Sequence, residues 1–256
     1  MMRRPWMAAA LCLGTMAASR APLQTPRHYR LDIKTTQVVD LAAMGQGEQR
    51  IQISTTGFVT LESHDSAGGQ AVKIVLDSLQ LGDSSPISPE QAKAANGAIW
   101  NGFVPSSGRI EHLELTEDNP IANAVTGVLQ QLFPPMKAGA KEGQTWTDTT
   151  DSEGAPGLAV RTVTNFQTSA DSFHGKKALR LAGASSSAIS GTQESPQGSV
   201  AFEGTGTATV DWYIGPDGVM LGSSYHGTQS LKLTAPVSPQ PLPVTITIEG
   251  TTALLE

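Results

Sequence analysis

Apolar and polar residues alternate along most of the chain, which is the pattern of strands with one buried face. Tyr29, Leu31 and Ile33 show it first, between charged neighbours. Short glycine-containing turns separate the first three such segments, so we expect them to form an antiparallel meander. The predicted strands are residues 29–41, 50–61, 71–81, 98–104, 109–115, 144–149, 158–168, 176–189, 200–214, 219–233 and 244–249.

Two segments have helical features instead. Ser88 and Pro89 are typical of a helix start, and they predict a short helix that ends before Gly97. A longer helix is predicted over residues 120–133, with Asp118 or Asn119 as its cap and with Pro134-Pro135 after it. Its apolar residues recur at helical spacing and can either close a core over a sheet or line a cavity. The candidate ligand-binding residues are therefore Ile121, Val125, Leu129 and Leu132.

The elements together predict a mainly β (α+β) fold. We expect a large curved antiparallel sheet, or open half-barrel, with one or two helices packed on its concave face. The sequence Gly215-Pro216-Asp217-Gly218 predicts a hairpin turn between the two strands around it. Residues 191–198 are expected to form a flexible loop, and residues 236–243 a proline-rich link. Residues 22–256 are predicted to be a single β-rich domain.

The N-terminal residues are typical of a secretory signal peptide. Arg3 and Arg4 precede an apolar run over residues 6–18, which is followed by small residues. We therefore predict a signal peptide at residues 1–21 and export to the periplasm or the extracellular space, although the segment could also stay attached as an anchor. The one cysteine of the chain, Cys12, would leave with the signal. The mature chain would then have no disulfide and no thiolate chemistry.

The charge of the chain excludes some partners. The sequence has 17 Lys and Arg against 23 Asp and Glu, and removal of the predicted signal would take away three arginines and no acid. An acidic chain without a basic patch is not expected to bind nucleic acid. The apolar run at the N-terminus is too short for a transmembrane helix, and no later segment is longer, so no transmembrane segment is predicted.

A search for catalytic motifs leaves only weak candidates. The sequence contains no nucleophile elbow, phosphate-binding loop or metalloprotease motif. His112 and Glu114 would share one face of a strand and could bind a metal or move a proton. Asp148, Asp151 and Glu153 have the composition, but not the spacing, of a calcium loop. Solvated side chains are the simpler interpretation of both clusters, so we expect no catalytic residue, no metal and no cofactor.

The segment from Phe133 to Trp146 (FPPMKAGAKEGQTW) supports a resemblance. It resembles a signature of uncharacterised exported bacterial β-rich proteins, in which a proline follows a helix and Gly-x-x-Trp opens a strand. Gly143 and Trp146 take those places, and Trp146 is expected to anchor the end of the helix to the sheet. The layout of strands, helix and strands is similar to the half-barrels of periplasmic lipoprotein carriers and lipid-binding lipoproteins. That resemblance implies a curved sheet that holds an acyl chain.

Three classes of function are consistent with these observations. The first is a non-catalytic carrier or binding module for an apolar small molecule or lipid, held between sheet and helix. The second is a structural or interaction protein of the cell envelope, which would use a sheet edge or an exposed apolar patch. The third is a hydrolase in which His112 or His226 meets a carboxylate in a cleft. A cavity lined by apolar side chains would favour the first.

Overall fold

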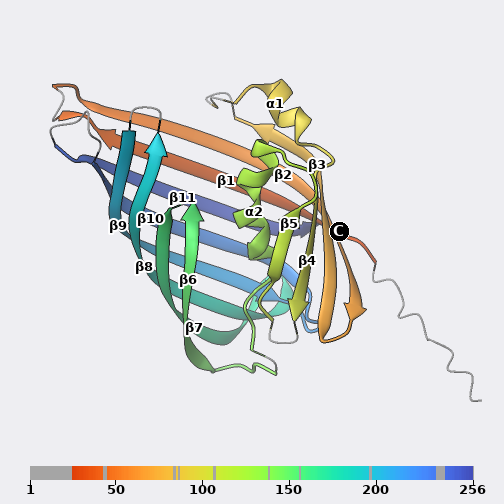
Figure 1. Ribbon diagram of the computed structural model, residues 1–256. Helices are drawn as coiled ribbons and strands as arrows, with labels where there is room; N and C mark the ends of the chain where they lie inside the picture. Colours follow the sequence, from red (N-terminus) through yellow and green to blue (C-terminus); the bar gives the residue numbers. More distant parts are fainter. Residues whose placement is uncertain are drawn as a thin grey trace, which may run out of the picture.

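The chain forms one antiparallel sheet that curls around a helix (Figure 1). In the computed structural model the eleven strands follow the order β5-β4-β3-β2-β1-β11-β10-β9-β8-β7-β6. The strands are β1 (Arg27–Asp40), β2 (Glu48–Ser66), β3 (Gly69–Leu81), β4 (Ile99–Pro105), β5 (Glu111–Leu115), β6 (Thr145–Ala155), β7 (Leu158–Phe173), β8 (Lys176–Ser195), β9 (Gly198–Ile214), β10 (Met220–Thr234) and β11 (Leu242–Leu255). Strands β5 and β6 are the free edges of this open sheet, which confirms the predicted fold class.

The structure describes residues 25–42, 45–82, 85, 87–105, 108–137, 139–155, 157–195, 198–234 and 240–255. The predicted signal peptide, Cys12 and most of the proline-rich link lie outside these ranges. Within them, no helix combines the length and the apolar character needed to cross a membrane.

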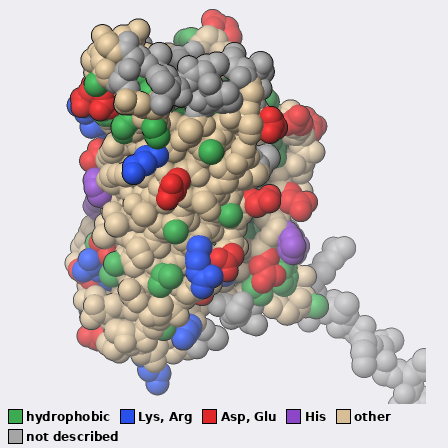
Figure 2. Space-filling view, turned by 60° about the vertical axis from the view of Figure 1, so that its left-hand side comes forward, with side chains coloured by type: hydrophobic (Ala, Val, Ile, Leu, Met, Phe, Trp, Pro, Cys, Tyr) green, Lys and Arg blue, Asp and Glu red, His purple; other side chains and the backbone are tan. Residues whose placement is uncertain are grey.

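The alternating pattern of the sequence separates the two faces of the sheet. On β1, Tyr29 and Leu31 are almost fully buried, while Arg30 between them is exposed. Tyr29 pairs with Val59 of β2, which is also buried, so the same face continues across neighbouring strands. The apolar residues face the concave side, where the helix lies. The face seen in Figure 2 carries mostly neutral polar side chains and backbone, with charged and apolar side chains scattered over it.

Two helices interrupt the strands in the described chain. Helix α1 (Pro89–Ala94) begins with the predicted Ser88 cap, whose hydroxyl accepts a hydrogen bond from the Gln91 amide. Helix α2 (Pro120–Leu129) is capped by Asn119, whose side chain accepts hydrogen bonds from two backbone amides of the first turn. The α-helix ends earlier than predicted, because its last turn is the 3₁₀ segment η2 (Gln130–Leu132). Phe133 precedes a proline and leaves the helical conformation, as the proline ring requires.

Helix α2 spans the hollow of the sheet and connects its two free edges. It follows β5 and leads to β6, the opposite edge strand. The Trp100 indole of β4 donates a hydrogen bond to the Thr126 hydroxyl over 2.9 Å. The Trp212 indole of β9 donates to the Gln131 carbonyl over 2.8 Å. The two tryptophans hold the helix from opposite sides of the hollow.

Two predictions about loops were wrong. Residues 191–195 are not a flexible loop, because β8 continues through Ser195 and pairs with β9 from Gly191↔Phe202 onward. Strand β6 likewise extends to Ala155, well beyond the predicted end at residue 149. Both segments are rich in Gly, Ser and Thr, so they lack the apolar alternation that identifies a strand, and backbone hydrogen bonds hold them instead.

Candidate functional site

The four ligand-binding candidates of α2 occupy different environments. Val125 and Leu129 are buried in the main core, where Leu129 is 0% exposed. Ile121 is half-buried and packs against the same core. Leu132, on the 3₁₀ turn, is the candidate that also lines a cavity. The helix therefore closes the core with most of its apolar stripe and reaches the cavity with its last turn.

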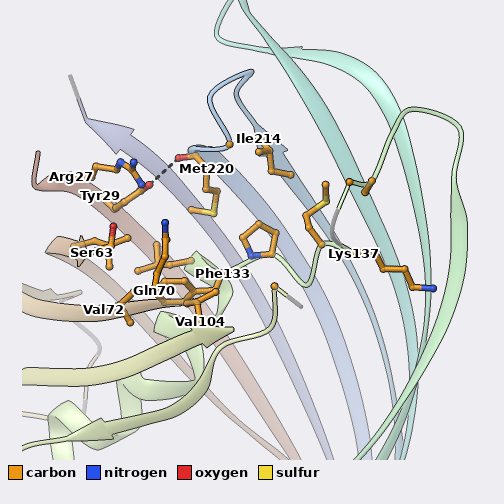
Figure 3. Close-up of a pocket in the computed structure, with 18 residues that line it drawn as sticks. Arg27, Tyr29, Ser63, Gln70, Val72, Val104, Phe133, Lys137, Ile214 and Met220 are labelled. Carbon is orange, nitrogen blue, oxygen red and sulfur yellow. Dashed lines mark hydrogen bonds between the residues drawn. The ribbon is translucent and has the colours of Figure 1, made fainter. Parts of the chain in front are cut away.

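This cavity has a volume of about 360 Å³ and opens where the chain leaves α2 (Figure 3). Strands β1 to β4 form one wall, and the β9–β10 hairpin and the segment after α2 form the other. Its lining residues are Arg27, Tyr29, Leu61, Ser63, Gln70, Val72, Val104, Gly108, Leu132, Phe133, Pro134, Met136, Lys137, Gly139, Ala140, Ile214, Gly218 and Met220. The volume lies at the lower end of the range of about 300–1,000 Å³ that is typical of small-molecule sites.

Most of the cavity wall is apolar because strands present their alternate residues to it. Leu61, Val72 and Val104 come from the concave faces of β2, β3 and β4. Ile214 and Met220 form a pair at the end of the β9–β10 hairpin and contribute the opposite side. Apolar walls with a few polar groups are the usual composition of a small-ligand pocket.

Most of the polar side chains of the cavity gather on one side, and Lys137 lies apart from them. Figure 3 shows Arg27, Tyr29, Ser63 and Gln70 together at the ends of β1, β2 and β3, across from Ile214. Ser63 is nearly buried, at 9% exposure. These side chains supply hydrogen-bond donors at one end of an otherwise apolar space.

Tyr29 has a structural role in this cluster. Its hydroxyl donates a hydrogen bond to the Met220 carbonyl over 3.0 Å, which ties β1 to the β9–β10 hairpin. Burial raises the pKa of Tyr29 from 10.0 to about 12; the nearby Arg27 charge lowers it, and Asp217 raises it by a smaller amount. The phenol is therefore protonated at neutral pH and acts as a donor rather than as a base.

The chain that leaves α2 covers the cavity by a close backbone contact. Gly108 has a φ of 95°, and a Cβ atom at this position would overlap the Met136 carbonyl oxygen. Glycine is the residue that tolerates both the positive φ and the close approach. Further along, Lys137 places its Nζ 5.5 Å from the centre of the Trp146 ring, which stacks on Phe166 at 5.2 Å. Trp146 thus contacts the segment that follows the helix, while Trp212 holds the helix end itself.

A larger hollow, of about 680 Å³, lies over β6 to β9. Its lining is rich in hydroxyl and amide side chains and includes the Arg180–Asp211 ion pair, with a distance of 2.8 Å. Polar area exceeds apolar area on this lining, although Trp146 and Phe166 belong to it, whereas the smaller cavity is mainly apolar. The smaller cavity is therefore the better candidate for binding an apolar ligand.

The acid–base candidates lie apart from the cavity. His112 has a φ of 53° and is exposed, so the regular alternation that would place it beside Glu114 is broken there. His226 Nδ1 lies 3.8 Å from a Glu249 carboxylate oxygen, but both side chains are more than half exposed. In the described ranges, no three His, Cys, Asp or Glu side chains come together in a group that could hold a metal.

The acidic residues of β6 have basic partners. Asp148 accepts a hydrogen bond from Arg109, which lies just before the other edge strand, β5. Asp151 lies 3.7 Å from Arg161 of the neighbouring strand β7. Both aspartates therefore lie beside an arginine of another segment.

The sequence did not indicate most of the cavity residues. Tyr29, Ser63 and Gln70 come from the consecutive strands β1 to β3, whereas Met220 lies far away in the chain on β10, and only the sheet order brings it to the other three. One feature of the sequence could have pointed to the cavity: the long strand β1 begins with Arg27, close to the buried Tyr29. Without knowledge that β1 pairs with β11 and lies next to the hairpin, that signal could not locate a cavity.

Comparison with known proteins gives little further information. No family model matches the chain, and no curated protein matches it. A solved structure that describes lipid–protein interactions in lipovitellin is similar with a TM-score of 0.48 and 12% identity, covering 90% of this chain. This chain spans 25% of the lipovitellin chain. A structure from work on asymmetric conductivity of engineered proteins has a TM-score of 0.27 and 9% identity, covering 90% of this chain and 100% of that one. At such low similarity, neither structure indicates what this chain binds.

Proposed function

We propose that this protein is an exported, non-catalytic binding module for an apolar small molecule or lipid. The observation that supports the proposal most is the cavity of about 360 Å³ at the end of α2, whose walls are mainly apolar and whose polar side chains, except Lys137, gather on one side. An apolar ligand would gain free energy by leaving water, at roughly 25 cal/mol for each Å² of apolar surface that is buried. The predicted signal peptide is consistent with a carrier that works outside the cytoplasm.

The curved sheet is suited to this role because it leaves one end of its hollow open. Core side chains fill the middle of the hollow around α2, where Trp100 and Leu129 are both 0% exposed. The space beyond the last turn of the helix is bounded on one side by the described residues that follow it, at 133–137, 139 and 140. A ligand can therefore enter beside this segment without disturbing the core.

A cavity-filling variant tests the proposal. Met136 lines the cavity from an irregular segment, so Met136→Trp should fill part of the space with little effect on the sheet. We expect the affinity for a neutral polarity-sensitive fluorophore, such as N-phenyl-1-naphthylamine, to fall by roughly tenfold or more, which corresponds to about 1.4 kcal/mol. Fluorescence titration measures the affinity.

Ile51→Trp is the matched control, because Ile51 is 38% exposed and lies outside the cavity lining. It should bind the fluorophore as the wild type does. Equal binding by Met136→Trp and by Ile51→Trp would contradict the proposal.

The second candidate function, an interaction protein of the cell envelope, is favoured by one observation. Strand β6 is a free edge of eleven residues, which could pair with a strand of a partner. However, Asp148, Asp151 and Glu153 lie along this edge strand, and charged residues on an edge usually prevent such pairing. Large apolar side chains are also rarely exposed on the described surface, where Ile51 and Leu255 are the two cases.

A further inference from the structure

The cavity differs in charge from the rest of the protein. The whole chain has a formal net charge of −6, yet the described lining contains two cations, Arg27 and Lys137, and no Asp or Glu. Lys137 is exposed, but Arg27 is half-buried, and a site that binds only neutral molecules has no need of a half-buried cation, which loses hydration when a ligand covers it. The lining is therefore complementary to a ligand that carries negative charge.

Arg27 is the cation best placed to meet a ligand headgroup. It lies at the start of β1, beside Ser63 and Gln70, on the polar side of the cavity in Figure 3. Arg27 and Ser63 already interact with other groups, but a guanidinium has five N–H donors and a serine hydroxyl can both donate and accept. The three side chains can thus surround an oxyanion with charge-assisted hydrogen bonds.

The other charged groups near the cavity are arranged differently. Lys137 extends away from the Arg27 cluster in Figure 3 and has its Nζ over the Trp146 ring. Asp217 is close enough to influence Tyr29, but it is absent from the cavity lining, and its carboxylate accepts a hydrogen bond from the Val219 amide over 3.1 Å. An oxyanion bound by the Arg27 guanidinium would therefore lie away from the Lys137 ammonium group.

The size of the cavity limits the apolar part of the ligand. About 360 Å³ is near the minimum for a small-molecule site, so one flexible chain fits better than the two chains of a membrane phospholipid. Phe133 and Met220 offer apolar surface close to the polar cluster, since the Met220 carbonyl accepts the hydrogen bond of Tyr29.

We propose that the ligand is a single-chain amphiphile with an anionic headgroup, which binds with its headgroup at Arg27, Ser63 and Gln70 and with its chain along Phe133 and Met220. This inference rests on the proposed binding function and defines the class of its ligand. Ligands of this class have one alkyl chain and a headgroup that is a carboxylate or a phosphate.

Three probes with a ten-carbon chain, the carboxylate carbon included, test the inference: decanoate, decanol and decyltrimethylammonium, each kept below its micelle concentration. Isothermal titration calorimetry or displacement of the neutral fluorophore gives their affinities. We expect decanoate to bind roughly tenfold more tightly than decanol, equivalent to about 1.4 kcal/mol, and the ammonium to bind most weakly. Octyl phosphate and octanol form a second pair. The pair in which the anion gains more affinity over its alcohol shows whether the site prefers a carboxylate or a phosphate.

The variant Arg27→Gln should remove the advantage of decanoate, so that decanoate and decanol bind with similar affinities. Lys137→Gln, which removes the same charge from the other side of the lining, is the matched control and should keep most of that advantage. Arg27→Lys should restore part of it, because the charge returns without the planar fork of donors. Circular dichroism verifies that each variant is folded.

Salt dependence of the wild type gives a readout that needs no variant. Raised ionic strength screens the headgroup contact, so the decanoate affinity should fall while the decanol affinity stays constant or rises. Equal affinity for the three probes in the wild type would overturn the headgroup inference and leave the proposed binding function intact. Failure of all three probes and of the neutral fluorophore to bind would overturn both.

Discussion

At the scale of single residues, a few side chains join parts of the sheet that are distant in sequence. Trp212 reaches from β9 to the last turn of the α2 segment, and Tyr29 reaches from β1 to the hairpin carbonyl of Met220. Both are aromatic residues with a polar end, and each places that end at a backbone carbonyl while its ring is buried. These two hydrogen bonds fix the positions of the hairpin and of the helix end, and both of these segments form part of the cavity wall.

Tyr29 gives a prediction at high pH. Its folded-state pKa, about 12, lies above the value of 10.0 expected for an unfolded chain, because the charged phenolate would be buried. Its contribution to stability should be complete below pH 10 and disappear as the pH rises through 12. A shift of this size corresponds to about 2–3 kcal/mol of the free energy of unfolding.

Urea unfolding at a series of pH values, for the wild type and Tyr29→Phe, measures this contribution. The variant should lose about 1–3 kcal/mol at neutral pH, because the Met220 carbonyl loses its donor. Between pH 10 and 12 its stability should fall less steeply than that of the wild type. Parallel pH profiles for the two proteins would show that Tyr29 does not titrate as described.

Leu129 belongs to the core and not to the cavity wall. The sequence predicted Leu129 as a cavity residue, but the side chain is fully buried in the core. A charged residue at this position would place an unpaired carboxylate among apolar side chains, which the fold does not tolerate. Leu132, one turn further along, is the member of the stripe that a ligand can reach.

At the scale of elements, the segment after α2 depends on a single glycine contact. Gly108 and Gly97 both have positive φ, at 95° and 83°. A Cβ on Gly108 would overlap the Met136 carbonyl, whereas one on Gly97 would meet open space. Alanine variants at the two positions therefore separate two free-energy costs: that of the positive φ, which both variants have, and that of the overlap with Met136, which Gly108→Ala alone has.

We predict that Gly97→Ala costs about 1–2 kcal/mol, the usual cost of a left-handed conformation for a residue with a side chain. Gly108→Ala should cost clearly more, on the order of 3 kcal/mol or above, since the Met136 segment must also move. Chemical denaturation compares the two variants, and fluorophore binding should weaken for Gly108→Ala alone. Equal losses of stability would show that the contact with Met136 is unimportant.

The sequence predicted the elements that carry strong local signals. The Ser88 and Asn119 caps marked helix starts, and the turn at residues 215–218 marked the β9–β10 hairpin. It did not predict that β8 runs through residues 191–195, because small polar residues give no apolar alternation there. Long-range pairing holds such a segment in the sheet, and pairing of this kind is not visible in a local window.

The candidate site was predictable only in part for a related reason. The helix and its apolar stripe could be identified, and Leu132 does line the cavity. The stripe alone could not show which of its residues face the core and which face open space, since both environments favour the same side chains. The polar cluster at Arg27, Ser63 and Gln70 depends on the register of three strands, which the sequence does not specify.

At the scale of the whole molecule, one open sheet has its two free edges connected by the helix that fills its hollow. The ion pair between Arg109 and Asp148 joins the two edge regions on the outside. Both side chains are substantially exposed, so the pair adds little stability. The helix and the core packed around it therefore hold the hollow at a width that leaves a cavity at one end.

Binding in this cavity is the central claim, and methionine methyl groups can observe it directly. Beyond the predicted signal peptide the chain has three methionines, Met44, Met136 and Met220, and the last two line the cavity. Met44 lies outside the described residues. Protein labelled with ¹³C at the methionine methyls and titrated with decanoate should show saturable shifts of the Met136 and Met220 signals, assigned by single Met→Leu variants. Signals that stay unchanged at saturating decanoate, or that drift without saturation, would contradict binding in this cavity.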